Sequence, residues 1–227
     1  LTMTQAIRAA IFDLDGTLLD TLSDIAHAMN GVLAARGLPE HPVDAYRRMV
    51  GSGLEMLVRR AVPDAVARSR TVVAALTGEL REAYAREPVA RTRPYEGIPI
   101  LLEDVRTRGI PMAVLSNKAD ELVQDIVAGF FAHDLFEVVQ GMRDDVPPKP
   151  DPTSARSIAA RLGVETDEVV YLGDSDVDMH TARNAGMAAV GAAWGFRGAA
   201  ELREAGAQIV IEAPGDLIGV IDSRTRG

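Results

Sequence analysis

The chain has 227 residues, of which 47% are hydrophobic and 25% charged, and its net charge is −9. This size and composition are typical of a globular protein with one large domain or two small ones. The negative charge argues against partners such as nucleic acid or an anionic membrane surface. The chain has no cysteine, which excludes disulfides, zinc–thiolate sites and thiol catalysis.

No apolar run approaches the ~20 residues that a membrane-spanning helix needs. The first residues include a short apolar stretch, but it runs into acidic residues instead of a small-residue cleavage site, so we expect no secretory signal. We therefore expect a cytoplasmic protein that does not enter a membrane, either a monomer or a homodimer.

The first predicted element is a buried strand over residues 6–12, which is apolar and ends at an acidic turn. Helical spacing then begins at Leu22, with apolar residues recurring every three or four positions, and extends to about Glu87. Within it, Gly37 and Pro39 end the first helix. Further helices are predicted near 43–50, 54–61 and 64–86, and no strand interrupts them.

After residue 93 short apolar runs alternate with helical patterns. Strands are predicted at 112–117, 136–140, 168–174, 187–192 and 208–211. One helix is predicted before the first of these strands, ending at residue 108, and others at 119–128, 152–162, 176–185 and 198–205, with a last helix after the final strand. This alternation predicts an α/β fold with a doubly wound, Rossmann-like parallel sheet. We assign residues 1–20 and 89–227 to this core and residues 21–88 to an inserted all-helical domain.

Polar residues follow several of these strands at their carboxyl ends, where ligands bind in doubly wound sheets. Because carboxylates crowded at one edge of a sheet repel each other, they indicate a bound cation. Oxygen ligands without histidine or cysteine favour a hard ion, and Mg²⁺ in particular. The residues concerned are Asp13 and Asp15, Ser116 and Asn117, and Asp174, Asp176 and Asp178.

A magnesium ion held by few protein groups usually also binds an anionic substrate, most often a phosphate. Lys149 is a candidate to offset the phosphate charge, because the surrounding prolines in VPPKPDP restrict its backbone. Ser116 and Asn117 are neutral donors suited to phosphate oxygens.

This arrangement resembles the haloacid dehalogenase-like hydrolase superfamily over nearly the whole chain. Four family motifs stand in order: Asp13-Leu14-Asp15-Gly16-Thr17 after a strand, Ser116 ending the next core strand, Lys149, and the acids of GDSDVD, Asp174 and Asp178. The helical insert looks like the family's cap. The stretches SNK, KPDP and AWGF are most similar to the phosphoglycolate phosphatase group.

The resemblance implies a phosphatase that acts on a small phosphorylated metabolite, phosphoglycolate in particular. Asp13 would be the nucleophile that forms an aspartyl-phosphate. Asp15 would protonate the leaving oxygen and later activate water, so it must start protonated, which neighbouring carboxylates favour. Mg²⁺ would be held by the Asp13 side chain, the Asp15 backbone carbonyl and Asp174, while Asp178 would orient the metal shell or Lys149.

In the insert, Gly51 and Gly53 bracket a turn whose backbone amides can approach a ligand, and Arg47 lies nearby. We expect these residues to bind substrate, although a solvated helix face explains Arg47 equally well. The alternative functions are those of a pyrophosphatase, of a hexose-phosphate mutase and of a catalytically silent binding module.

Simpler structural explanations exist for several of these residues. Asp13 and Asp15 also fit a turn, and Ser116 also fits a helix N-cap. Asp176 and Asp178 suit the start of a helix. Lys118 fits a surface or helix-start position better than a catalytic one. Lys118 and Lys149 are the only lysines among 24 basic residues.

Overall fold

The computed structural model describes residues 6–87 and 89–225. Its described part contains a six-stranded parallel sheet with the strand order β5-β4-β1-β6-β7-β8, which confirms the predicted α/β core. The strands are β1 (Ala9–Phe12), β4 (Met112–Ala119), β5 (Val138–Met142), β6 (Val169–Gly173), β7 (Ala188–Ala192) and β8 (Ile209–Ile211).

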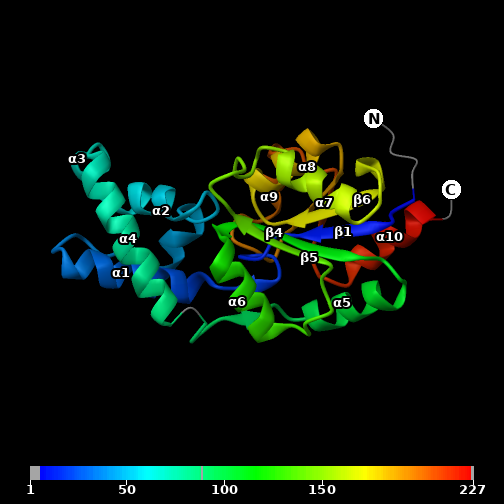
Figure 1. Ribbon diagram of the computed structural model, residues 1–227, viewed down its shortest axis with the longest axis horizontal. Coiled ribbons are helices and arrows are strands. Elements are labelled where there is room, and N and C mark those ends of the chain that lie inside the picture. The colour runs from blue at the N-terminus through cyan, green and yellow to red at the C-terminus, as the bar shows by residue number, and fades with distance from the viewer. Residues whose placement is uncertain (1–5, 88, 226–227) are drawn as a thin grey trace.

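Helices cover both faces of the sheet, so its strands are apolar on both sides (Figure 1). In β1, for example, Ala10 and Phe12 face one apolar cluster while Ala9 and Ile11 face the other. The first cluster includes α5 (Ile98–Thr107), α6 (Asp120–Phe130) and α10 (Asp216–Thr225). The second includes α7 (Thr153–Arg161), α8 (Asp176–Ala185) and α9 (Ala199–Glu204). A short 3₁₀ turn, η2 (Thr166–Glu168), precedes β6.

The helices of residues 22–86 gather at one end of the molecule, beside the sheet (Figure 1). They are α1 (Leu22–Ala35), the 3₁₀ helix η1 (Val43–Arg48), α2 (Leu54–Ala61), α3 (Asp64–Ala67) and α4 (Arg70–Arg86). Helix α4 packs against both α1 and α2. We call residues 22–86 the helical segment.

Two details of the helical segment differ from the prediction. The element near 43–50 is a 3₁₀ helix, not an α-helix. The single helix predicted over 64–86 is divided in two, because Ser69 leaves the helical conformation and its side chain caps α4 by accepting a hydrogen bond from the Val72 amide.

A feature that the sequence pattern did not reveal joins the two ends of the helical segment. Strands β2 (Leu19–Asp20) and β3 (Arg93–Pro94) pair antiparallel, so the chain enters and leaves the segment side by side. Asp24, which is buried in α1, reinforces this junction by accepting hydrogen bonds from the Arg91 and Thr92 amides and the Thr92 hydroxyl. The predicted domain limits at residues 1, 88 and 227 lie outside the described residues.

Among the described helices, none is long and apolar enough to cross a membrane.

Candidate active site

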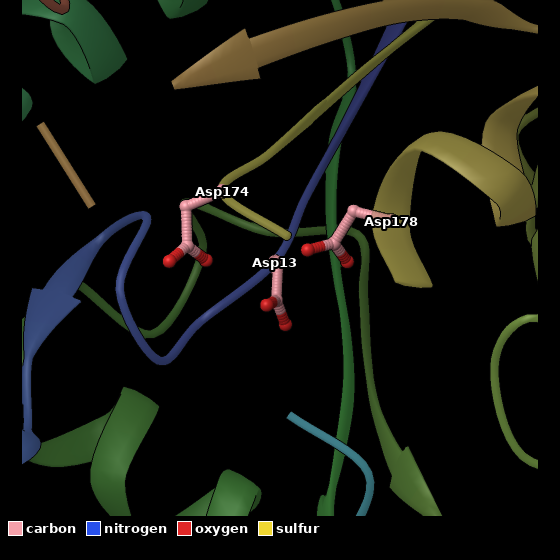
Figure 2. Close-up of side chains that lie close together, drawn as sticks. All are labelled: Asp13, Asp174 and Asp178. Carbon is pink, nitrogen blue, oxygen red and sulfur yellow. The ribbon is translucent and has the colours of Figure 1, made fainter. Parts of the chain in front are cut away.

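Three carboxylates converge at the carboxyl edge of the sheet (Figure 2). Asp13 directly follows β1, Asp174 directly follows β6, and Asp178 lies in the first turn of α8. One oxygen of each lies within 4.8 Å of the others, although Asp13 and Asp174 are far apart in the sequence. The parallel sheet therefore brings together three of the five predicted acids; within the described residues, the carboxylates of Asp15 and Asp176 do not belong to this group.

Asp174 is fixed by both of its carboxylate oxygens. Oδ1 accepts a hydrogen bond from the Thr17 hydroxyl at 3.2 Å, and Oδ2 accepts one from the Phe196 amide at 2.6 Å. Two glycines make room for it: a Cβ at Gly16 would lie 2.3 Å from Oδ2, and a Cβ at Gly195 would lie 2.2 Å from the Asp174 Cβ. The glycine of the first motif is thus required by packing as well as by its φ of +88°.

Asp178 is fully buried and holds Lys149. Its Oδ1 lies 2.7 Å from Lys149 Nζ, which also donates to the Leu115 carbonyl at 3.0 Å. Its Oδ2 accepts hydrogen bonds from the Ser175 amide and hydroxyl, and the Asp178 amide donates to the Ser175 hydroxyl, which completes the capping box of α8. Asp178 is therefore both a residue of the helix start and the anchor of the lysine.

Asp13 lies between a cation and two anions. Lys149 Nζ is 2.9 Å from Asp13 Oδ1, an ion pair without hydrogen-bond geometry, and this buried oxygen has no hydrogen bond in the described part of the chain. Burial and the neighbouring Asp178 raise the pKa of Asp13 to about 7, although Lys149 opposes them. Burial and the charges of Asp178 and Asp13 also raise the pKa of Asp174 well above its ordinary value.

These features fit a magnesium ion. The candidate ligands are all oxygen atoms, which hard cations prefer. The carboxylates of Asp13 and Asp174 are buried and crowded, and one Asp13 oxygen lacks a hydrogen bond among the described residues. A cation would offset the repulsion between them. The side chain of Asp178, in contrast, is occupied by Lys149 and Ser175.

The Asp15 side chain has different neighbours from those predicted. Its Oδ1 accepts hydrogen bonds from Lys118 Nζ at 2.5 Å and from the Thr21 hydroxyl at 2.7 Å, so its closest charged group is a cation instead of a carboxylate. The prediction that Lys118 lies at the surface or at a helix start is wrong. Lys118 belongs to β4, its side chain is only 5% exposed, and its ammonium lies over the ring of Tyr84 in α4.

The structure assigns distinct positions to the two polar residues in β4. Ser116 lies beside the acids, and its hydroxyl accepts a hydrogen bond from the Lys118 amide. It is not the N-cap of α6, which is Ala119. Asn117 is buried, and its side-chain amide binds the Lys149 backbone and donates to the Gly51 carbonyl at 3.1 Å. Asn117 therefore connects the loop that carries Lys149 to the helical segment. These contacts occupy its side-chain amide, which was predicted to bind phosphate.

Gly51 and Gly53 lie over the site, but Arg47 does not. The two glycines, with φ of +112° and +83°, line the same cavity as Asp13 and Asp15. The Arg47 side chain is 42% exposed and donates to the Gly195 carbonyl. It is absent from the described cavity wall, so this arrangement gives no support to the prediction that Arg47 binds substrate.

Sequence reasoning missed Arg197, which connects the core to the helical segment. Its guanidinium donates to the carbonyls of Arg47 and Val50, at 2.5 and 2.9 Å. The helical segment is thus joined to the core through backbone carbonyls. Because any residue supplies a backbone carbonyl, this contact leaves no charge pattern in the sequence. The stretch AWGF immediately before Arg197 was the nearest available signal.

A small cavity of about 50 Å³ lies between the sheet edge and the helical segment. One side of its wall carries the polar groups, including Asp13, Asp15, Ser116, Lys118, Lys149 and Asp174. The opposite side is apolar and consists of Ile25, Leu54, Leu57, Leu80 and the ring of Tyr84. The site is therefore a partly enclosed pocket between the sheet edge and the helical segment, with its charged groups on the side of the core.

Comparison with known proteins agrees with the geometry. Residues 10–192 match the model of the haloacid dehalogenase-like hydrolase family. The chain is 30% identical to the phosphoglycolate phosphatase of Aquifex aeolicus, over 96% of this chain and 98% of the relative. It is 34% identical to that of Rhodospirillum rubrum, over 83% and 80% of the two chains.

A solved structure from Lactobacillus delbrueckii subsp. bulgaricus has the same fold, with a TM-score of 0.89 and 31% identity over 96% of this chain and 99% of the other. The family match spans both the acids at the sheet edge and the inserted helices. The chain belongs to the haloacid dehalogenase-like hydrolase family.

Proposed function

We propose that the protein is a Mg²⁺-dependent phosphatase that hydrolyses a small phosphomonoester, phosphoglycolate in particular, through an aspartyl-phosphate. The observation that carries this proposal is the group formed by Asp13, Asp174, Asp178 and Lys149, of which all but Asp178 line a partly enclosed pocket. Relatives that align with nearly all or most of the chain are phosphoglycolate phosphatases, which supports the substrate.

Asp13 is the proposed nucleophile. It lines the pocket, and the buried Lys149 ammonium beside it offsets negative charge as a phosphate approaches. Attack by Asp13 on phosphorus releases the alcohol and leaves the phosphate on the carboxylate, and water then cleaves this acyl phosphate. Lys149 is held in place by Asp178 and the Leu115 carbonyl, so its charge is already positioned before substrate binds.

Asp15 is the proposed general acid and base. It lines the pocket two residues from Asp13, and Lys118 and Thr21 fix one of its oxygens. In the first half of the reaction it would give a proton to the leaving oxygen, and in the second it would take one from water. Ser116, beside these acids, has a hydroxyl suited to donate to a phosphate oxygen.

The residues that would hold Mg²⁺ are the carboxylates of Asp13 and Asp174 and the backbone carbonyl of Asp15. When bound, the ion supplies charge neutralisation for the phosphate and for the crowded acids. Gly16 and Gly195 leave the space that Asp174 needs in order to face the site.

The helical segment is the proposed cap, within an insert of residues 21–88, and the core is formed by residues 1–20 and 89–227. The cavity under it is small, which favours a compact metabolite over a phosphoprotein or a nucleic acid. The backbone at Gly51 and Gly53 faces the same space and is available to the non-phosphate part of the substrate.

The decisive experiment is a kcat/KM panel with phosphoglycolate, other small phosphomonoesters, pyrophosphate and a hexose phosphate, each with Mg²⁺ and with EDTA. We expect Mg²⁺-dependent phosphate release, with phosphoglycolate among the best substrates. Preference for pyrophosphate, isomerisation of the hexose phosphate, or full activity in EDTA would contradict the proposal.

A further inference from the structure

The pocket contains a buried cation that the proposed chemistry leaves without a substrate role. Lys118 Nζ is 2.5 Å from Asp15 Oδ1 and 4.8 Å from the centre of the Tyr84 ring. An ammonium has three donors; one is used for Asp15, and the Tyr84 hydroxyl also lies beside the ammonium, which leaves a donor for a further acceptor. Removing an ammonium from water is costly unless its donors find acceptors. The position of Lys118 in the pocket wall therefore suits an anion that enters the pocket.

A second polar group points to the same ligand. Tyr84 is 2% exposed and lines the pocket, and its hydroxyl lies beside the Lys118 ammonium but forms no hydrogen bond of regular geometry within the described chain. A buried hydroxyl without a partner costs roughly 1–3 kcal/mol, so such groups usually serve a ligand or water. Lys118 comes from the core and Tyr84 from α4, so together they approach the pocket from both of its sides.

The other cations of the described pocket wall are already committed. Lys149 is shared between Asp13 and Asp178. The guanidinium of Arg197 donates to two backbone carbonyls of the helical segment and lies 3.4 Å from Glu201. Lys118 is the cation of this wall that can bind a further acceptor. If its ammonium rotates toward a ligand, Asp15 still accepts a hydrogen bond from the Thr21 hydroxyl.

We infer that Lys118 and Tyr84 form the receptor for an anionic group, a carboxylate, on the leaving part of the substrate. Lys118 is the specificity-determining cation, and the Tyr84 hydroxyl donates to the same carboxylate. The apolar side chains around them, Ile25, Leu54, Leu57 and Leu80, offer no competing polar partner. A site built to pair a charged group rejects the neutral analogue, because the buried donors are then left unpaired.

This inference rests on the proposed function and specifies which residues select the substrate. The test compares phosphoglycolate with 2-hydroxyethyl phosphate, which has a CH₂OH group in place of the carboxylate. We expect the wild-type protein to prefer phosphoglycolate by at least ~100-fold in kcat/KM. We expect Lys118→Met to reduce this preference to about tenfold or less, and Tyr84→Phe to reduce it by about five- to tenfold. The ratio of the two kcat/KM values is the informative quantity, because an effect of Lys118 that operates through Asp15 alone changes kcat/KM equally for both substrates.

A binding measurement makes the test independent of turnover. Calorimetry in Mg²⁺ compares 3-phosphonopropionate, a non-hydrolysable analogue of phosphoglycolate, with propylphosphonate, which lacks the carboxylate. We expect the wild-type protein to bind the carboxylate analogue more tightly, and Lys118→Met to bind the two equally. Arg81→Met is the matched control, because it removes an exposed cation from the same helix as Tyr84 and should leave both ratios unchanged.

The possible failures are distinguishable. If the wild-type kcat/KM for 2-hydroxyethyl phosphate equals that for phosphoglycolate, the receptor inference is overturned while the phosphatase stands. The same holds if Lys118→Met lowers kcat/KM equally for both substrates and leaves the binding preference intact. If no phosphate ester is hydrolysed but the binding preference depends on Lys118, the proposed function fails and the receptor stands. Equal binding of both phosphonates by the wild-type protein overturns the receptor.

Discussion

Lys149 and Asp178 form an almost completely buried ion pair, with 2.7 Å between Nζ and Oδ1, and the same ammonium lies 2.9 Å from Asp13. The two residues are 29 positions apart and come from a loop and a helix. Removing one member of a buried pair leaves an uncompensated charge, which typically costs about 3–5 kcal/mol. The lysine that faces the nucleophile therefore depends on Asp178 for its position.

Asp178→Asn should lower both stability and kcat. The amide keeps the shape but removes the charge that holds Lys149, so we expect a loss of roughly 3 kcal/mol in unfolding free energy and of tenfold or more in kcat. Asp176→Asn is the control, because Asp176 lies in the same helical turn but is partly exposed. Urea unfolding and steady-state kinetics measure the two effects. Equal behaviour of both variants would show that Asp178 only caps the helix.

Asp13→Asn should abolish turnover and leave the fold intact. The amide is nearly the same size but a far poorer nucleophile, so we expect kcat/KM to fall by at least ~1,000-fold, or about 4 kcal/mol. Circular dichroism checks the fold, and steady-state kinetics with phosphoglycolate checks the activity. A variant that keeps more than about a tenth of wild-type kcat/KM would rule out Asp13 as the nucleophile.

Gly16→Ala should disturb Asp174. A Cβ at Gly16 would lie 2.3 Å from the Asp174 carboxylate, and the φ of +88° is unfavourable for alanine. We expect a stability loss of at least ~1 kcal/mol and weaker Mg²⁺ activation, seen as a higher Mg²⁺ concentration for half-maximal activity. Gly78→Ala is the matched control: Gly78 lies within α4, and a Cβ there meets no atom within 4 Å. It should be neutral or stabilising by up to ~1 kcal/mol. Unchanged Mg²⁺ activation in Gly16→Ala would argue against Asp174 as a ligand.

Without metal, stability should fall as pH rises from about 4 to about 7. Burial and Asp178 raise the pKa of Asp13 from 3.8 to about 7 in the folded protein. Between these values the folded state holds a proton that the unfolded chain has released, so a higher pH favours unfolding, by at most ~1.4 kcal/mol per pH unit for one group. Urea titrations in EDTA measure this slope. Asp13→Asn should reduce it, and a wild-type slope of the opposite sign would contradict the prediction.

Much of the fold and of the candidate site could be predicted from the sequence, because the signals are local. Continuous apolar strands that alternate with helices indicate a parallel sheet, and such a sheet brings the ends of its strands to one edge. Asp13 and Asp174 stand directly after their strands, so a parallel sheet places both at one edge, and the pairing of β1 with β6 in the structure brings them together. The same reasoning identified Lys149, whose proline-rich loop is a visible local signal.

The tertiary structure alone decided the partners of Lys118. This lysine precedes a helix in an otherwise ordinary stretch, and its burial depends on Asp15 and Tyr84, which lie on distant parts of the chain. Its one sequence signal was the rarity of lysine, since both lysines of the chain lie in the same pocket.

The β2–β3 pair and the contacts of Arg197 were equally invisible to sequence patterns. Two-residue strands carry no periodicity, and backbone carbonyls accept hydrogen bonds whatever the side chain is. Local pattern therefore determined the elements and the order of the acids. Long-range packing determined which side chains close the pocket over them, because burial and ion pairing depend on residues that meet only in the folded chain.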